Sequence, residues 1–300
     1  MIEARRQFLS LLTSVPLWSL CPRRAHAETA LAESLAALES RSGGRLGVQV
    51  IDAERGLALG HRGEERFGLC STFKLPLAAV VLQQIDAGHL DGDEWIEYGE
   101  QDLVPYAPVT SAHLAEGRMR LIDLAEAAQV TSDNVAANLL LRRLGGPAAV
   151  TAAIRSWGDT HTRLDRVEPE MNYVPAGELR DTTTPAAMAA TALRLFNSEL
   201  LSASAQARLR GWMIATETGA RRLRAGFPAD WVAGDKTGTG YRSGMPNKHN
   251  DVAIVWRAQR PWLAVAAYYE APGEFPSARA EDDAVLAEVG RLVAAWSASA

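Results

Sequence analysis

Two residue types that can carry out acyl transfer stand three positions apart in the segment Ser71-Thr72-Phe73-Lys74. This spacing places both side chains on one face of a helix that starts here, with Ser71 at the positive end of the helix dipole. A lysine can activate a serine hydroxyl only when burial or a neighbouring charge lowers its pKa, and arginine cannot replace it. Lysine is scarce in this chain, at positions 74, 236 and 248 only, against 31 basic residues in total. Taken alone, the pattern is still more typical of a helix N-cap followed by a solvated lysine.

Three further segments carry residues that acyl transfer could use. Ser132-Asp133-Asn134 precedes a predicted helix, where such residues usually serve only as caps. Lys236-Thr237-Gly238 lies in a predicted strand and is not a phosphate-binding loop, because aspartates stand where that motif needs glycines. Glu168-Pro169-Glu170-Met171-Asn172 lies in a stretch without periodicity and alone is typical of an exposed acidic loop. Each segment by itself therefore has an ordinary structural explanation.

The order of the four segments is far more specific than any one of them. Ser-x-x-Lys, Ser-Asp-Asn, Glu-x-x-x-Asn and Lys-Thr-Gly follow one another across about 170 residues, and in this order the chain resembles the class A serine β-lactamases. The resemblance runs through nearly all of the chain after residue 27. It includes the segments Tyr106-Ala107-Pro108-Val109-Thr110 and Arg180-Asp181-Thr182-Thr183-Thr184-Pro185.

The resemblance implies hydrolysis of the β-lactam amide bond of penicillins and cephalosporins through a serine acyl-enzyme, which gives antibiotic resistance. Ser71 would attack the lactam carbonyl, and its own backbone N–H with that of Thr239 would bind the developing oxyanion. A general base, Glu168, would activate the water that deacylates the enzyme, whereas the base for acylation is left open between Lys74 and Glu168. The implied catalytic residues are Ser71, Lys74, Ser132 and Glu168.

The substrate-binding residues follow from the groups that β-lactams carry. Lys236 and Thr237 suit the carboxylate and Asn134 suits the side-chain amide, while Tyr106 could form a wall of the cleft by stacking. Arg222 matches a family position where an arginine supplements the carboxylate site, with an ordinary surface arginine as the alternative. The full implied set is Tyr106, Asn134, Asn172, Arg222, Lys236, Thr237, Gly238 and Thr239.

The resemblance also assigns structural residues and shows two departures. Asp181 would pair with Arg166 at the base of the loop that carries the catalytic glutamate, and so hold that loop. Cys70 and Thr239 resemble a subset of the family that hydrolyses carbapenems, but Gly240 stands where that subset has a second cysteine. The disulfide is therefore not expected and carbapenem activity stays open. The connection at 241–250 is longer and more polar than usual, with no predictable effect on specificity.

Composition excludes several other classes of protein. A formal net charge of -5 offers no basic surface for nucleic acid, and 47% hydrophobic residues are enough for a globular core. Two cysteines and six histidines show no CxxC, HxH or HExxH spacing, so neither a metal nor a cofactor is expected. The expected partners are small β-lactam molecules, with no nucleic acid and no membrane anchor, and the expected state is a monomer.

Residues 1–27 are typical of an export signal. Arg5 and Arg6 begin it, a 14-residue mostly apolar stretch follows, and Ala25-His26-Ala27 is a small-x-small cleavage site. The order Arg5-Arg6-Gln7-Phe8-Leu9 favours the twin-arginine route, with a general-secretion signal as the alternative. The apolar stretch is too short to span a bilayer. The protein is therefore expected to be periplasmic or secreted.

Hydrophobic periodicity predicts the elements that must position these residues. A helix ends near Gly43-Gly44, two strands follow, a block of helices occupies the middle, and three strands and a helix complete the chain. The expected fold is α+β, an α/β sandwich in which helices flank a five-stranded antiparallel sheet. An all-helical domain, residues 63–220, is inserted between the two parts of the sheet domain, residues 28–62 and 221–300, and the active site lies between them. Predicted helices cover 75–84, 121–129, 135–144 and 185–196, and predicted strands cover 45–53, 56–60, 231–239, 252–258 and 262–270.

Three other functions compete with this interpretation. A penicillin-binding transpeptidase or carboxypeptidase shares Ser-x-x-Lys and Lys-Thr-Gly but resembles this chain less around Glu168. A non-catalytic peptidoglycan-binding module of the same fold would not be expected to keep nucleophile, lysine and glutamate together. A Ser-His-Asp esterase is the weakest alternative, because the chain has no G-x-S-x-G segment.

Overall fold

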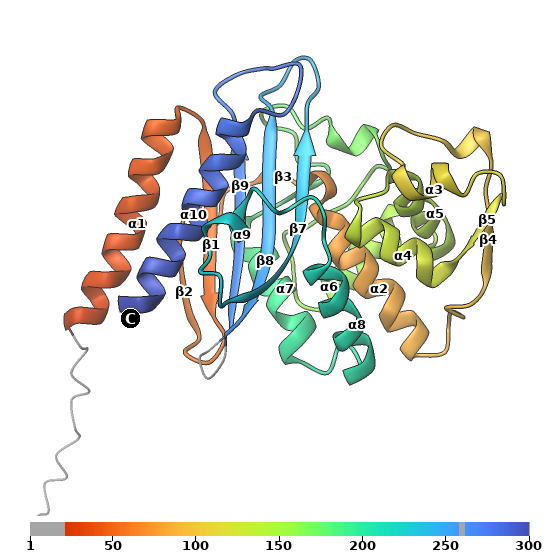
Figure 1. The fold of residues 1–300 in the computed structure, drawn as a ribbon, viewed down its shortest axis with the longest axis horizontal. Helices are drawn as coiled ribbons and strands as arrows, with labels where there is room; N and C mark the ends of the chain where they lie inside the picture. The colour runs from red at the N-terminus through yellow and green to blue at the C-terminus, as the bar shows by residue number, and fades with distance from the viewer. Residues whose placement is uncertain (1–21, 258–261, 300) are drawn as a thin grey trace, which may run out of the picture.

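The computed structural model describes residues 22–257 and 262–299. Five strands form one antiparallel sheet in the order β2-β1-β9-β8-β7, so that strands from both ends of the chain meet side by side (Figure 1). The expected five-stranded antiparallel sheet is therefore confirmed. Its strands are β1 (Arg45–Asp52), β2 (Leu57–His61), β7 (Val232–Gly240), β8 (Lys248–Trp256) and β9 (Leu263–Glu270).

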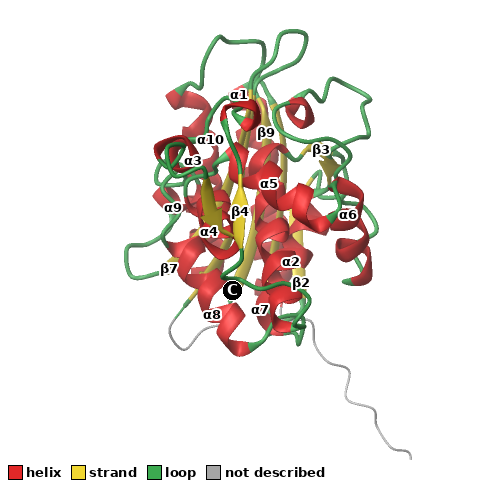
Figure 2. Ribbon diagram, turned by 90° about the vertical axis from the view of Figure 1, so that its right-hand side faces the viewer, coloured by secondary structure: helices red, strands yellow, loops and turns green. Residues whose placement is uncertain are grey.

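Helices cover both faces of this sheet. On one face α1 packs against α10, and the short α9 packs against α10, while the remaining helices lie on the other face and beyond the β7 edge (Figures 1 and 2). The helices are α1 (Pro22–Ser42), α2 (Lys74–Asp86), α3 (Pro108–Ala112), α4 (Leu121–Val130), α5 (Asn134–Leu144), α6 (Pro147–Ser156), α7 (Pro185–Asn197), α8 (Ala203–Ile214), α9 (Leu223–Gly226) and α10 (Ala280–Ser299).

Two short antiparallel ladders and three 3₁₀ turns lie outside the main sheet. The two-stranded ladders are β3 (Phe67–Gly68) with β6 (Thr182–Thr183) and β4 (Trp95–Glu97) with β5 (Arg118–Arg120). The 3₁₀ turns are η1 (Cys70–Phe73), η2 (Glu100–Asp102) and η3 (Glu170–Asn172).

The hydrophobic core has two layers because the sheet is covered on both sides. Along β8, Val252 and Ile254 belong to the layer shared with the central helices, whereas Ala253 and Val255 belong to the layer shared with α1 and α10. Every residue of β8 is buried as a result. A strand buried on both faces carries an almost continuous apolar run instead of an alternating pattern, and this run indicated the position of β8 in the sequence.

The predicted elements are largely confirmed, with corrections at their ends. The helix predicted over 135–144 ends as expected at Gly145, whose φ of 93° is the left-handed conformation that a glycine C-cap adopts. Strand β8 begins at Lys248, four residues before its predicted start, so the connection expected over 241–250 is shorter and covers 241–247. The start was missed because its first residues, Lys248 to Asp251, are polar yet buried.

Part of the sequence interpretation lies outside the described residues. This applies to residues 1–21 of the predicted export signal and to residue 258, the last residue of the strand predicted over 252–258. Helix α1 begins at Pro22 and thus includes residues 22–27. No helix within residues 22–257 and 262–299 is long and apolar enough to cross a membrane.

Two glycines let α9 approach α10 very closely. A Cβ atom on Gly290 would lie 2.3 Å from the carbonyl oxygen of Leu223, and one on Gly226 would lie 2.0 Å from that of Ala287. Real Cβ atoms do not approach backbone oxygens so closely, so a larger residue would push the two helices apart. The residue before α9 is Arg222, and the contact therefore fixes the position of an implied substrate-binding residue.

We expect Gly290→Ala to lower the free energy of unfolding by about 1–3 kcal/mol, the usual cost of an extra methyl group in a packed region. Gly211→Ala is the matched control, because Gly211 lies inside α8 and no atom lies within 4 Å of its added Cβ. There the better helix propensity of alanine should raise stability by about 0.5–1 kcal/mol. Urea unfolding measures both, and equal effects of the two substitutions would contradict the close contact.

Candidate active site

Ser71 lies in the 3₁₀ turn η1 rather than in the first turn of an α-helix. Helix α2 begins only at Lys74, three residues after the expected start, and Ser71 lies in the 3₁₀ turn that leads directly into its N-terminal end. The preceding residue, Cys70, has a φ of 43° and is fully buried, and its thiol is free. Burial raises the pKa of this thiol to about 12. The turn still brings the hydroxyl of Ser71 within 2.9 Å of Lys74 Nζ.

The ammonium group of Lys74 has no exposed surface and is enclosed by oxygen atoms. Lys74 Nζ donates to the carbonyl of Ser132 at 2.8 Å and to Oδ1 of Asn134 at 2.5 Å, in addition to Ser71 Oγ. Its ion pair with Glu168 Oε1 is 3.2 Å long, and both side chains are completely buried. Burial lowers the pKa of Lys74 from its ordinary value, whereas the negative charge of Glu168 opposes this shift.

A second buried lysine approaches the same group of side chains from the edge strand β7. Lys236 Nζ donates to Ser132 Oγ at 2.9 Å and to the carbonyl of Thr237 at 2.9 Å. Its pKa is well below the ordinary value, first because of burial and second because of the nearby charge of Lys74. Ser132 therefore lies between two cations, with its hydroxyl 3.4 Å from Lys74 Nζ.

The turn at Ser132 is held by its neighbour Asp133. Ser132 has a φ of 64°, a strained conformation for a residue with a side chain. The side chain of Asp133 caps α5 by accepting from the N–H of Ala136 at 2.8 Å. It also accepts from the backbone N–H groups of Val109 and Thr110, which connects α5 to α3. The ordinary explanation of this aspartate as a helix cap is thus confirmed.

Glu168 reaches the site from an irregular loop and is almost completely buried. Its Oε1 is 3.3 Å from Ser71 Oγ, and its Oε2 accepts from Asn172 Nδ2 at 2.5 Å. Its backbone is fixed by Asn138, which accepts from Glu168 N at 2.9 Å and donates to Glu168 O at 2.8 Å. The explanation of this segment as an exposed acidic loop is therefore wrong at Glu168.

Asn138 is a residue that the sequence interpretation missed. It stands four positions after Asn134 in α5, and residues at this spacing share one face of a helix. The sequence did contain a signal for it, namely a second side-chain amide on the face of the predicted helix next to Asn134.

The base of this loop is closed by an ion pair whose carboxylate is fully buried and whose guanidinium is partly exposed. Arg166 Nε is 2.5 Å from Asp181 Oδ2, and Asp181 has no exposed surface. Asp181 Oδ1 also accepts from the backbone N–H groups of Asp165 and Arg166. The far side of the loop is tied by Arg242, whose guanidinium donates to the carbonyl of Pro169 at 3.0 Å.

Arg222 is 5% exposed, so the alternative of a surface arginine is wrong. Its guanidinium donates to the carbonyls of Gly238 and Asn250 and to Thr239 Oγ1 at 2.7 Å. Asp283, which the sequence interpretation missed, pairs with Arg222 Nε at 2.8 Å. These contacts place a fixed positive charge behind the Lys-Thr-Gly strand.

The implied residues line a cleft of about 750 Å³, a size typical of small-molecule sites. Tyr106 is 59% exposed and lines the cleft together with Tyr241. Asn134 lines the cleft, but its amide is already engaged by Lys74 Nζ and by the carbonyl of Pro105. The third lysine, Lys248, does not line the cleft and is paired with Glu270. Implied residues that line the cleft are Ser71, Tyr106, Ser132, Asn134, Asn172, Arg222, Thr237 and Thr239.

The remaining implied residues lie directly behind these. Lys74, Glu168 and Lys236 are buried against them, and Gly238 follows Thr237 in β7. A Cβ on Gly238 would lie 3.1 Å from Cys70 Cβ and 3.2 Å from Ser71 N, so this glycine permits the close approach of β7 to the nucleophile. Within the described residues, no cluster of histidine, cysteine or acidic side chains is arranged to hold a metal.

Comparison with known proteins agrees with this geometry. A model of the beta-lactamase enzyme family matches residues 30–297. The chain belongs to the β-lactamase family. It is 43% identical to Beta-lactamase FAR-1 of Nocardia farcinica over 260 residues, covering 86% of this chain and 80% of that protein. It is 42% identical to the Carbapenem-hydrolyzing beta-lactamase KPC of Klebsiella oxytoca over 285 residues, covering 94% of each.

Solved structures of class A β-lactamases share the fold. The class A enzyme of the last common ancestor of Gram-negative bacteria superposes with a TM-score of 0.83 at 53% identity, covering 89% of this chain and 98% of that one. A β-lactamase from Burkholderia vietnamiensis superposes with a TM-score of 0.85 at 45% identity, covering 90% and 97%. This class A β-lactamase is thus a serine hydrolase that opens β-lactam antibiotics and gives resistance to them.

The ion pair between Arg166 and Asp181 should affect both stability and turnover, because it holds the loop that carries Glu168. We expect Asp181→Ala to lower the free energy of unfolding by about 1–3 kcal/mol, because it leaves Arg166 and the backbone N–H groups of Asp165 and Arg166 without their shared acceptor. Turnover of a penicillin should fall as the loop loosens. Glu288→Ala, which breaks the exposed pair with Arg291, should cost under about 1 kcal/mol. Thermal unfolding and kcat measure the effects, and full activity in a stable Asp181→Ala variant would contradict this role.

Proposed function

We propose that Ser71 is the nucleophile of this enzyme and forms the acyl-enzyme with the opened lactam. The contact that carries this proposal is the 2.9 Å hydrogen bond between Ser71 Oγ and the fully buried Lys74 Nζ. A buried amine with a lowered pKa can take the proton of a hydroxyl, which an exposed lysine cannot do at neutral pH. Glu168 Oε1, 3.3 Å from Ser71 Oγ, is the other group able to accept this proton.

The leaving nitrogen of the lactam needs a proton donor, and we assign Ser132. Its hydroxyl accepts a hydrogen bond from Lys236 Nζ and lies 3.4 Å from Lys74 Nζ. A hydroxyl between two ammonium groups gives up its proton more readily, because the positive charges stabilise the alkoxide that forms. The proton can be replaced from Lys74, which closes the relay. Backbone N–H groups of Ser71 and Thr239 would bind the oxyanion.

Glu168 and Asn172 form the deacylation pair. Glu168 Oε2 accepts from Asn172 Nδ2 at 2.5 Å, which orients the carboxylate, and the opposite oxygen faces Ser71. A water that contacts both residues would be activated by the carboxylate and would attack the acyl carbon from the loop side. General-base assistance of this kind contributes about 10²–10⁴ in rate.

The substrate class of the proposal is penicillins and cephalosporins. Thr237, Thr239 and the guanidinium of Arg222 present donors along one wall for the substrate carboxylate, with Lys236 buried behind them. Tyr106 and Asn134 also line the cleft and would contact the substrate side chain. No metal or cofactor takes part in this scheme.

We also propose the organisation and location of the protein. The sheet domain, residues 28–62 and 221–300, and the helical domain, residues 63–220, enclose the cleft between them. Residues 1–27 would direct export to the periplasm or the medium by the twin-arginine route, because the segment Arg5-Arg6-Gln7-Phe8-Leu9 has the composition of such a signal. The mature enzyme would act as a monomer.

The decisive experiment is turnover of a chromogenic cephalosporin by the purified protein. We expect many turnovers per enzyme molecule, and a loss of at least about 10³-fold in Ser71→Ala, since the nucleophile is removed. Colour that stops at one equivalent per molecule would instead indicate a penicillin-binding transpeptidase, whose acyl-enzyme persists.

A second experiment separates acylation of the enzyme from deacylation. In Glu168→Gln, deacylation should fail, so incubation with a penicillin should add one penicillin mass to the intact protein. Absence of the adduct, while the wild type turns over, would contradict the role of Glu168 in deacylation.

The same variant tests Lys74 as a base. The charge of Glu168 raises the pKa of Lys74, so its removal should lower that pKa further below the ordinary 10.5. Only neutral lysine accepts a proton, so adduct formation should rise with pH to a plateau with a midpoint well below 10.5. Rapid-quench mass spectrometry between pH 5 and about 10 measures this midpoint. A rate that keeps rising to the ordinary lysine value would argue against Lys74.

A further inference from the structure

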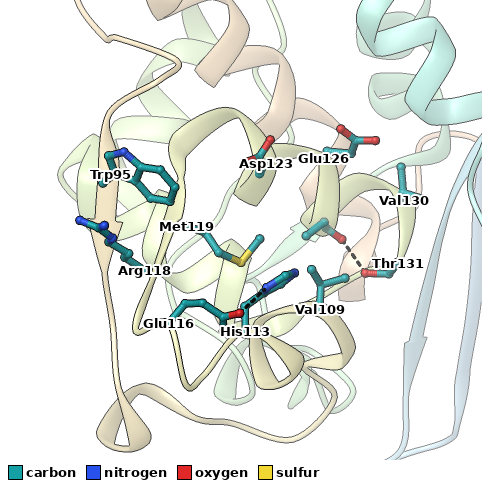
Figure 3. A pocket seen from close by; sticks show the side chains of 11 residues that line it. Trp95, Val109, His113, Glu116, Arg118, Met119, Asp123, Glu126, Val130 and Thr131 are labelled. Atoms are coloured by element: carbon teal, nitrogen blue, oxygen red, sulfur yellow. Dashed lines mark hydrogen bonds and ion pairs between the residues drawn. The ribbon is translucent and has the colours of Figure 1, made fainter.

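A second cavity of about 660 Å³ lies in the helical region, between α3, α4 and the β4–β5 ladder (Figure 3). It shares no lining residue with the catalytic cleft, and its volume is close to that of the cleft. Both volumes fall within the range of sites that enclose small organic molecules. The reaction scheme does not use this cavity.

The floor of the cavity is apolar. Met119 and Ala127 are buried beneath it, and Val109 and Val130 line its side. The indole ring of Trp95 extends from the β4–β5 ladder toward Met119, with 56% of the residue exposed (Figure 3). A methionine and an exposed tryptophan offer favourable contacts to a flat apolar ring.

The rim of the cavity is mainly acidic. The carboxylate of Glu126 makes no hydrogen bond or ion pair with another residue in the described part of the chain, and the carboxylate of Glu116 pairs only with His113 Nδ1, at 3.8 Å. Asp123 is paired with Arg120 at 2.8 Å. Figure 3 shows Asp123 and Glu126 on one side of Met119 and the Glu116–His113 pair on the other.

The basic residue that lines the cavity does not neutralise these carboxylates. The guanidinium of Arg118 lies over the ring of Trp95, 4.7 Å from its centre, and forms no ion pair within the described residues. Asp123 is neutralised by Arg120, so Glu116 and Glu126 stand against the single guanidinium of Arg118 and the cavity keeps an excess of one negative charge. Neither Glu116 nor Glu126 pairs with an arginine or lysine within the described residues. The charge favours a cation and disfavours an anion such as a β-lactam carboxylate.

We propose that this cavity is a second binding site, for a small organic monocation with an aromatic body. The ring would lie on Met119 beside Trp95, and the cationic group would face the acidic rim of the cavity. An apolar floor for the ring and a rim with excess negative charge for the cation match the two parts of the lining.

The site adjoins segments of the catalytic machinery without entering the cleft. Val109 lines the cavity, and its backbone N–H donates to Asp133 at 3.0 Å. Thr131 also lines it and directly precedes Ser132. A ligand bound here would therefore contact the outer side of α3 and the end of α4, while the cleft remains open to substrate.

Benzamidine and its neutral isostere benzamide provide the test. The protein is labelled with ¹⁵N at tryptophan, and the indole resonance of Trp95 is assigned by its loss in Trp95→Phe. We expect benzamidine to shift this resonance with a saturable curve. Benzamide should bind at least about 3-fold more weakly, because it lacks the charge that the exposed carboxylates attract. Equal binding of the two molecules would overturn the proposal.

Charge-removing variants locate the site. Glu116→Gln with Glu126→Gln should weaken benzamidine binding about 3- to 10-fold. The matched control is Glu33→Gln with Glu64→Gln, which removes two exposed carboxylates elsewhere and should leave binding unchanged. An unchanged affinity in the first double variant would overturn the proposal. So would competitive inhibition of cephalosporin turnover with the same constant, since it would place benzamidine in the cleft.

Discussion

A lysine ammonium without exposed surface must find its hydrogen-bond acceptors inside the protein. Burying such a charge is costly unless it is paired and hydrogen-bonded, and Lys74 meets this demand with oxygen atoms of four residues from three separate segments of the chain. Ser71 and Lys74 come from one turn of backbone, Ser132 and Asn134 from the start of α5, and Glu168 from an irregular loop. The oxygen atoms that enclose Lys74 are the same ones that the acyl-transfer scheme assigns to catalysis, so stability and chemistry rest on one cluster.

The rest of the fold keeps these oxygen atoms in place. The side chain of Asp133 holds the Ser132 turn, and Asn138 clamps the backbone of Glu168 from α5. The ion pair between Arg166 and Asp181 closes the base of the Glu168 loop. On the opposite wall, β7 supplies a second buried cation, Lys236, whose pKa is lowered by burial and by the nearby charge of Lys74. Two like charges in one buried site are tolerated because Ser132 and Glu168 lie between and beside them.

Much of this arrangement could be predicted from the sequence, for reasons that differ between residues. Periodicity located the helices and strands, and the order of four short segments located Ser71, Lys74, Ser132, Glu168 and Lys236, because acyl transfer needs those residue types together. Contacts that support these residues from distant parts of the chain could not be predicted in this way. Asn138 acts on the main chain of Glu168, and Asp283 acts on Arg222, so neither forms part of a short pattern. The 3₁₀ turn before Lys74 and the polar start of β8 were missed because tertiary packing, rather than local preference, decides them.

The thiol of Cys70 gives the site a property unrelated to catalysis. It lies next to the nucleophile, fully buried, and its pKa of about 12 leaves almost no thiolate at neutral pH. Alkylating reagents can therefore reach it only in molecules in which the packing between η1 and β7 has opened. The rate at which this thiol is labelled then depends on the fraction of molecules in which η1 and β7 have separated. That rate therefore reports the local opening free energy of the region that holds the nucleophile.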